Sequence, residues 1–262
     1  MLAPGNGKTK TGRLWTYVRD DRAAGSTAAP AVWFAYSPDR KGEHPQQHLR
    51  EFSGILQADA YVGFHQLYEQ GRIQEAACWA HARRKFYELM QAHKSPVATE
   101  AVERIGALYG IENEIRRSPD ECREVRQSRS RPLLNSMRQW LEASLAKLSK
   151  KSDTSAAIRY ALTRWDALMR FCDDGRVEID NNVAERALRT VAIGRKNYLF
   201  AESDRGGERA ATFYSLIGTA KLNGLDPEAY LRQVLTRVAD HPVNRIAELL
   251  PWNIDTGSTA TL

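Results

Sequence analysis

The sequence lacks the features that mark membrane-spanning and secreted proteins. No apolar run approaches the roughly 18 residues that a membrane-spanning helix needs, and the N-terminus shows no signal-peptide pattern. Cysteine is scarce: Cys78, Cys122 and Cys172 have no paired spacing and therefore predict no disulfide framework. We expect a protein of a reducing cytoplasm with no membrane partner.

What the sequence does contain is enough chain for a real core and an excess of positive charge. Its 262 residues suit one large domain or two small ones. The 38 Lys+Arg residues exceed the 32 Asp+Glu residues, and the formal charge of +6 favours a polyanionic partner. The positive charge gathers in clusters at Lys8–Lys10–Arg13, Arg83–Arg84–Lys85, Arg116–Arg117, Arg123–Arg126–Arg129–Arg131, Lys147–Lys150–Lys151 and Arg186–Arg189–Arg195–Lys196. A solvated helix face explains any single cluster equally well, but together the clusters favour nucleic acid.

Short strands and helices alternate over the first third of the chain. Two aromatic, β-branched runs predict a hairpin with a long connection, formed by residues 13–18 and 31–36. A helix is expected over about 45–52, with Gly54 at its end. Further elements are expected as a buried strand at 54–59, a helix at 61–68, a buried strand at 74–79 and a helix from near His81.

From about residue 92 to 175 the pattern is helical throughout. Ser118 and Glu121 fit a capping box. Apolar residues from Ile158 to Cys172 recur at helical spacing, which predicts one helix closed by Gly175. The same stripe predicts that Trp165 lies in the core and does not stack on nucleic-acid bases. Two or three more helices are expected over 206–252, so the sequence predicts an α/β fold interrupted by a helical insertion.

Two carboxylates on separate elements are candidates for metal binding. Asp59 is expected at the carboxyl end of a strand, where open α/β sheets place their sites. Glu185 is expected early in a helix that begins after Asp180 and Asn181, which are natural N-caps. Mg²⁺ prefers such oxygen ligands. The spacing alone equally allows a turn residue at Asp59 and a salt bridge from Glu185 to Arg189.

Several segments resemble the transposase of the insertion sequence 66 family, a branch of the DDE transposases. The matching stretches are residues 7–15, 39–44, 56–64, 78–86, 179–189, 194–200 and 217–227, which cover nearly the whole chain. The segment Ile-Asp-Asn-Asn-Val-Ala-Glu-Arg-Ala-Leu-Arg at 179–189 is the most specific of these.

The resemblance implies a ribonuclease H-like α/β core and DNA transposition by two-metal phosphodiester cleavage and strand transfer. Asp59 matches the family's second catalytic, metal-binding acid and Glu185 the third, with two Mg²⁺ or Mn²⁺ ions expected in the intact enzyme. The cap formed by Asp180, Asn181 and Asn182 would aim Glu185 at the metals. The expected segments are 1–91 for the first part of the core, 92–175 for the helical insertion, 176–205 for core completion with the glutamate helix, and 206–262 for the C-terminal helical region.

The implied partners are transposon ends and target DNA, further copies of the chain, and accessory proteins of the same element. The expected location is the bacterial cytoplasm, with the nucleoid when DNA is bound. The residues expected to contact DNA are His81, Arg83, Arg84, Lys85, Arg186, Arg189, Arg195 and Lys196. A zinc site at Cys78 and His81 is disfavoured, because no second Cys/His pair stands at suitable spacing.

The family's first catalytic aspartate lies on a strand just before the turn at 7–12. Because this chain begins at Met1, we expect that strand, and the family's N-terminal DNA-binding portion, to be missing. Asp20, Asp21 and Asp39 lie in hairpin or loop stretches and are poor substitutes. The chain alone is therefore expected to have little or no strand-transfer activity. The alternatives are a catalytically dead DNA-binding fragment that regulates or competes with an intact transposase, and a remnant without function.

Overall fold

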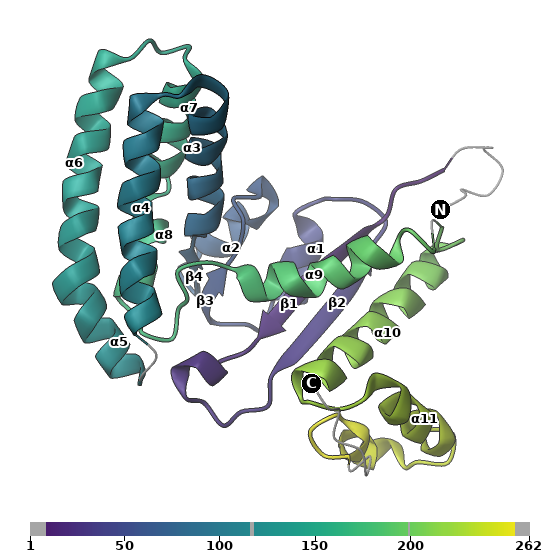
Figure 1. Cartoon of the computed structure of the whole chain (residues 1–262). Helices are drawn as coiled ribbons and strands as arrows, with labels where there is room; N and C mark the ends of the chain where they lie inside the picture. Colours follow the sequence, from purple (N-terminus) through teal and green to yellow (C-terminus); the bar gives the residue numbers. More distant parts are fainter. Residues whose placement is uncertain (1–8, 116–117, 199, 255–262) are drawn as a thin grey trace. The chain divides into compact units, whose positions relative to one another are not determined.

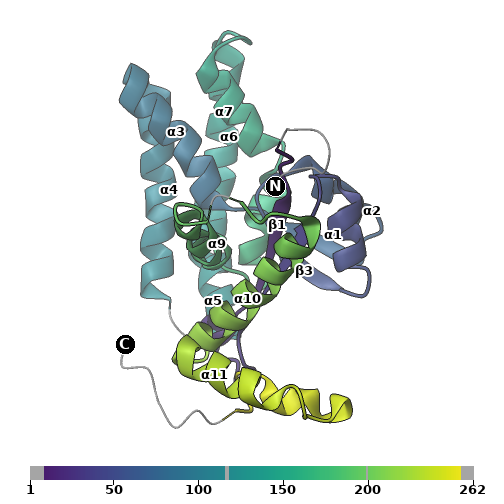
Figure 2. The same ribbon diagram turned by 90° about the vertical axis from the view of Figure 1, so that its right-hand side faces the viewer.

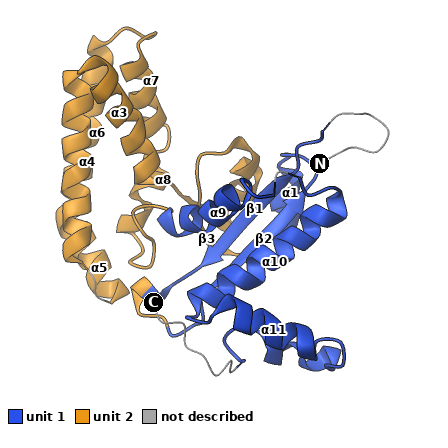
Figure 3. Ribbon diagram, turned by 45° about the vertical axis from the view of Figure 1, so that its right-hand side comes forward, with its two compact units in different colours: residues 1–22, 27–48, 182–262 blue, residues 23–26, 49–181 orange. Residues whose placement is uncertain are grey.

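The computed structural model describes residues 9–115, 118–198 and 200–254. These residues form two compact units (Figures 1 and 3): unit 1 comprises 1–22, 27–48 and 182–262, and unit 2 comprises 23–26 and 49–181. Gly7 and Lys8 of the first family-like segment, and the basic pair Arg116–Arg117, lie outside the described residues. The expected core segment 1–91 contributes to both units, and the expected helical segment 92–175 lies within unit 2.

Unit 1 is a two-stranded hairpin with helices packed against it. Its elements are β1 (Arg13–Arg19), β2 (Ala31–Ser37), α1 (Glu43–His48), α9 (Asn182–Gly194), α10 (Asp204–Leu222), α11 (Pro227–Arg237) and the 3-10 helix η5 (Val243–Leu249). The 3-10 helix η1 (Arg22–Ala24) has its first residue in unit 1 and its other two in unit 2. The strands pair antiparallel, with Arg13 opposite Ser37 and Arg19 opposite Ala31. The predicted hairpin with a long connection is confirmed.

Helix α10 covers the outer edge of β2. The Val32 amide donates to Thr219 Oγ1 at 3.1 Å, and the Phe34 amide donates to Ser215 Oγ at 2.8 Å. These hydroxyls take the place of a neighbouring strand, because backbone donors left unpaired in a buried position are costly. Gly218 permits the close approach, since a Cβ there would lie 2.5 Å from Val32 Cγ1.

The C-terminal helices form a second small core in unit 1. Helices α10 and α11 follow one another in Figure 2, and each begins at a capping side chain: Ser203 accepts from the Gly206 amide and Asp226 from the Ala229 amide. Tyr230 is buried between them and donates its hydroxyl proton to the carbonyl of Leu249. The expectation of two or three helices over 206–252 is confirmed by α10, α11 and η5.

Unit 2 combines a small parallel sheet with a helical bundle. Its elements are β3 (Gly54–Gln57), the 3-10 helix η2 (Val62–Phe64), α2 (His65–Glu69), β4 (Ile73–Ala76), α3 (Trp79–His93), α4 (Pro96–Glu114), α5 (Pro119–Val125), the π-helical turn η3 (Arg126–Ser130), α6 (Arg131–Lys147), α7 (Asp153–Leu162), α8 (Trp165–Met169) and the 3-10 helix η4 (Arg170–Cys172). Strands β3 and β4 pair in parallel, and α3, α4, α6 and α7 lie side by side (Figures 1 and 2).

The bundle core is apolar and well filled. Trp79 and Trp165 meet edge to face with ring centroids 5.8 Å apart, and the Trp79 indole donates to the Leu168 carbonyl at 2.8 Å. Trp165 is only 2% exposed, which confirms its predicted place in the core. The capping box of Ser118 and Glu121 is also confirmed.

Several element boundaries differ from the sequence prediction. Helix α1 ends at His48, so Gly54 does not close it; Gly54 opens β3 with φ +135°, a backbone conformation that favours glycine. Strand β3 ends at Gln57 and is half-exposed, and Cys78 caps α3 and does not extend β4. The helix predicted through Gly175 breaks after Leu162, because Thr163 and Arg164 form a turn there.

The fold is mixed α/β, as predicted. The described residues contain two sheets of two strands each, β1–β2 and β3–β4. The ribonuclease H-like arrangement of these strands stays a prediction. Among the described residues, no helix is long and apolar enough to cross a membrane.

Candidate functional site

Asp59 lies in unit 2, two residues beyond the end of β3. The Ala58 amide donates to the Ala76 carbonyl, which extends the parallel ladder to the residue before Asp59. The Tyr61 amide donates to the Asp59 carbonyl at 2.7 Å, so the chain turns sharply there. Asp59 is exposed, and no hydrogen bond or ion pair engages its carboxylate in the part of the chain that the structure describes. Its oxygens are therefore available to a ligand.

Glu185 lies in unit 1, in the first turn of α9, and is exposed. Arg186 and Arg189 are exposed on the same helix, and Arg195 and Lys196 follow its end. Helix α9 packs against β1 through Ala187 and Val191. The predicted site residues thus divide between the two units.

The loop that precedes α9 packs on the bundle of unit 2. The Tyr109 hydroxyl donates to Asp180 Oδ2 at 3.2 Å, and the Trp79 amide donates to the Ile179 carbonyl. Cys78 Sγ accepts hydrogen bonds from the backbone of Asn181 and nearby residues, but burial dominates and raises the pKa of this thiol. The Asn181 Oδ1 atom is buried without a hydrogen-bond partner, so the capping role of Asn181 stays a prediction.

The first turns of α3 carry the basic residues predicted to contact DNA. His81 is half-buried, while Arg84 and Lys85 are exposed. Arg83 lies over the ring of Tyr87, with its Cζ 5.7 Å from the ring centroid. Within the described residues, none of Arg83, Arg84 and Lys85 has an ion-pair partner.

Two tyrosines that the sequence analysis does not single out interact electrostatically with Asp59. Burial raises the pKa of Tyr68 and of Tyr160, and the negative charge of Asp59 raises both further. The charges of Arg164 and Arg84 act in the opposite direction on the pKa of Tyr160. Tyr160 lies on the helical bundle, far from Asp59 in the chain, so the sequence alone does not reveal that the two residues interact.

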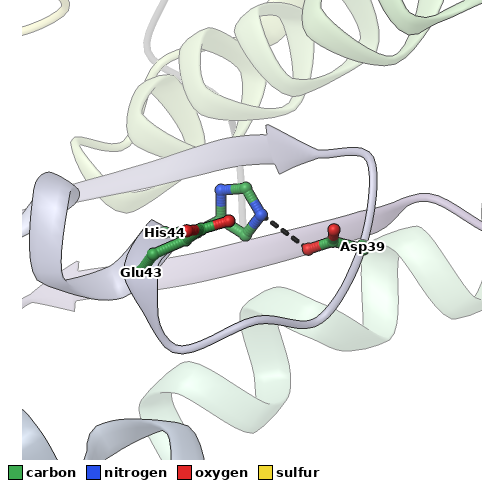
Figure 4. Close-up of side chains that lie close together, drawn as sticks. All are labelled: Asp39, Glu43 and His44. Carbon is green, nitrogen blue, oxygen red and sulfur yellow. Dashed lines mark hydrogen bonds and ion pairs between the residues drawn. The ribbon is translucent and has the colours of Figure 1, made fainter.

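The other aspartates of the N-terminal region have local partners. Asp39 Oδ1 lies 2.7 Å from His44 Nε2, and Glu43 completes a group whose ligand atoms lie within 4.8 Å of one another (Figure 4). Lys41 Nζ lies 3.6 Å from Asp39 and 3.7 Å from Glu43, so a cation already offsets part of the negative charge of this group. Asp20 pairs with Arg22 at 2.7 Å, and this hydrogen bond lowers the pKa of Asp20.

Comparison with known proteins identifies the family. Residues 1–209 match the model of the IS66 transposase family, and residues 215–252 match the model of the IS66 C-terminal element. The chain belongs to the IS66 transposase family. The resemblance drawn from the sequence motifs is therefore confirmed. No solved structure matches the chain.

Three curated relatives come from Sinorhizobium fredii (strain NBRC 101917 / NGR234). The uncharacterized protein y4hP is 47% identical over an alignment 272 residues long, and the alignment covers 97% of this chain and 49% of that protein. The uncharacterized proteins y4qI and y4jD are 45% and 38% identical, each over 96% of this chain and over 48% and 51% of their own lengths. The chain thus spans about half the length of the curated relatives that it matches.

Proposed function

We propose that this chain supplies catalytic and DNA-binding residues for DNA cleavage and strand transfer in an IS66 transposase. The family match over residues 1–209 carries this proposal. The exposed carboxylate of Asp59 and the cations of α3, all without an ion-pair partner among the described residues, support it. The substrates are transposon ends and target DNA, bound at the nucleoid, and the ribonuclease H-like arrangement is part of the proposal.

Asp59 and Glu185 are the proposed ligands of the divalent cations. Both are exposed, and carboxylate oxygens are the ligands that Mg²⁺ and Mn²⁺ prefer. Two such ions, when bound, would activate the attacking oxygen and stabilise the leaving oxygen of the phosphodiester.

The basic side chains hold and orient the DNA. Arg83, Arg84 and Lys85 on α3 would donate to backbone phosphates, and Arg186 and Arg189 on α9 would do the same beside Glu185. Such contacts carry no sequence information, but they fix the register of the duplex. Their contribution to the rate is the placement of the scissile bond, since a misplacement of about 1 Å can cost about a hundredfold.

A transposition assay with the protein that contains this chain tests the proposal. Asp59→Asn and Glu185→Gln each remove one negative charge and keep the side-chain size, and we expect each to lower product formation at least about a hundredfold. Glu103→Gln, at an exposed position on α4, is the matched control and should leave the rate unchanged. Activity near the parent level in both Asp59→Asn and Glu185→Gln would refute the assignment.

The same assay with the isolated 262-residue chain and Mg²⁺ or Mn²⁺ tests the expectation of little or no strand transfer. Salt-sensitive DNA binding without cleavage would support the alternative of a regulatory, catalytically dead fragment. Strand transfer by the isolated chain that depends on Asp59 would contradict both this alternative and the expectation of little or no strand transfer.

A further inference from the structure

The Tyr160 ring contacts two cations that come from different helices of the bundle or the turns beside them. Lys85 Nζ on α3 is 4.6 Å from the centroid of the Tyr160 ring, and Arg164 Cζ is 4.4 Å from the same centroid. Both distances lie within the roughly 6 Å over which an aromatic ring attracts a cation. The same ring therefore attracts both positive groups.

The Arg164 guanidinium is oriented but not neutralised. Its Nη1 donates to the Tyr160 carbonyl at 3.4 Å and to Thr163 Oγ1 at 3.2 Å. In the described parts of the chain, Arg164 and Lys85 have no ion-pair partner. The Nε and Nη2 atoms of Arg164 also have no hydrogen-bond partner among these residues. These donors are free to bind an anion.

The local environment favours a phosphate group over a carboxylate of the protein. Arg84, next to Lys85 on α3, is an exposed third cation without an ion-pair partner among the described residues, and the charge of Asp59 acts on Tyr160. A phosphodiester that approaches Asp59 would therefore meet these cations at the same time. Charge-assisted hydrogen bonds from arginine to phosphate are among the strong ones.

We propose that Lys85 and Arg164, positioned by the Tyr160 ring, together bind one backbone phosphate of the DNA beside Asp59. The inference rests on the proposed function for the identity of the anion. It assigns the helical bundle a direct part in substrate binding, through the turn between α7 and α8. Tyr160 acts as a positioning residue, because its ring holds the two cations that contact the phosphate.

The test is the salt dependence of DNA binding, measured without divalent metal so that catalysis plays no part. The logarithm of the binding constant falls with the logarithm of salt concentration by about 0.9 per neutralised phosphate of a duplex. If Lys85 and Arg164 share one phosphate, the double variant Lys85→Gln/Arg164→Gln should reduce this slope by about 0.9 in total. A reduction of about twice that value, or no reduction, would overturn the proposal.

A matched double variant controls for net charge. Arg129→Gln/Arg138→Gln removes the same charge from exposed positions that pair with Glu114 and Glu142, and its slope should equal that of the parent. Tyr160→Ala should reproduce the slope of the Lys85/Arg164 double variant, whereas Tyr160→Phe, which keeps the ring, should retain the parental slope. A parental slope in folded Tyr160→Ala would remove Tyr160 from the site. If the parent protein itself bound no DNA, the proposed function would be refuted instead.

Discussion

Unit 2 contains two basic regions that look alike in the sequence and differ in the structure. In the first, η3 and the start of α6, the cations pair with acids: Arg126 with Glu112 at 2.6 Å, and Arg129 with Glu114 at 2.6 Å. In the second, around the start of α3, Arg84 has no acidic partner among the described residues. A run of arginines therefore indicates positive potential only where the fold leaves it unneutralised.

The difference follows from the position of each helix. Arg126 is 3% exposed and also donates to the carbonyls of Phe171 and Val177, so it ties the loop before α9 to the bundle. A buried guanidinium needs such partners, because an unpaired buried charge is very costly. The cations of α3 are exposed or lie over aromatic rings, and none of them pairs with a carboxylate in the described part of the chain.

The largest effect is expected from Arg126→Met. The change leaves the Glu112 carboxylate nearly buried without its partner, and we expect a loss of about 3–5 kcal/mol in the free energy of unfolding, measured by urea denaturation. The double variant Arg126→Met/Glu112→Met should recover part of this loss, because it leaves no unpaired charge. A loss below about 1 kcal/mol in the single variant would show that the pair does not hold this region together.

The next effect concerns DNA affinity in the second region. Arg83→Gln/Arg84→Gln should reduce the salt slope of duplex binding by about 1 to 2 and leave the urea midpoint unchanged. Arg131→Gln/Arg138→Gln removes the same charge from residues that pair with Asp173 and Glu142, so it should not alter the slope. Equal slopes in the two double variants would abolish the distinction between the regions.

The sequence predicts the hairpin, the capping box and the core position of Trp165, because each depends on local pattern or a strong apolar stripe. It does not predict that Arg126 is buried and paired while Arg84 is free, since that depends on contacts between helices. The sequence also does not predict the break between helices at Thr163, for a related reason. The apolar spacing continues through the turn, and only packing against α3 and β4 shows that α7 and α8 are separate helices.

The third prediction concerns acid stability in the loop that Arg126 anchors. Arg176 binds the Asp174 carboxylate, with Nη2 and Oδ2 2.6 Å apart, and this hydrogen bond lowers the pKa of Asp174. A carboxyl with a lowered folded-state pKa stabilises the fold above its ordinary pKa, and that stabilisation disappears as pH falls through the lower value. We therefore expect the free energy of unfolding, measured in urea at pH values from 5 downward, to fall less steeply with pH in Asp174→Asn than in the parent. The exposed control Asp166→Asn should follow the parent, and a parental profile in Asp174→Asn would contradict the prediction.

The smallest effect should come from Arg129→Gln, and its smallness is what the comparison requires. Arg129 is exposed and its charge pairs with that of Glu114, so its removal takes away little from the surface potential that DNA meets. We expect an unchanged urea midpoint and a DNA affinity equal to that of the parent at the same salt concentration. If Arg129→Gln weakened binding as much as Arg84→Gln, paired cations would also contribute to DNA binding. The contrast between the two regions would then reflect total charge, and the local neutralisation seen in the structure would have no bearing on where DNA binds.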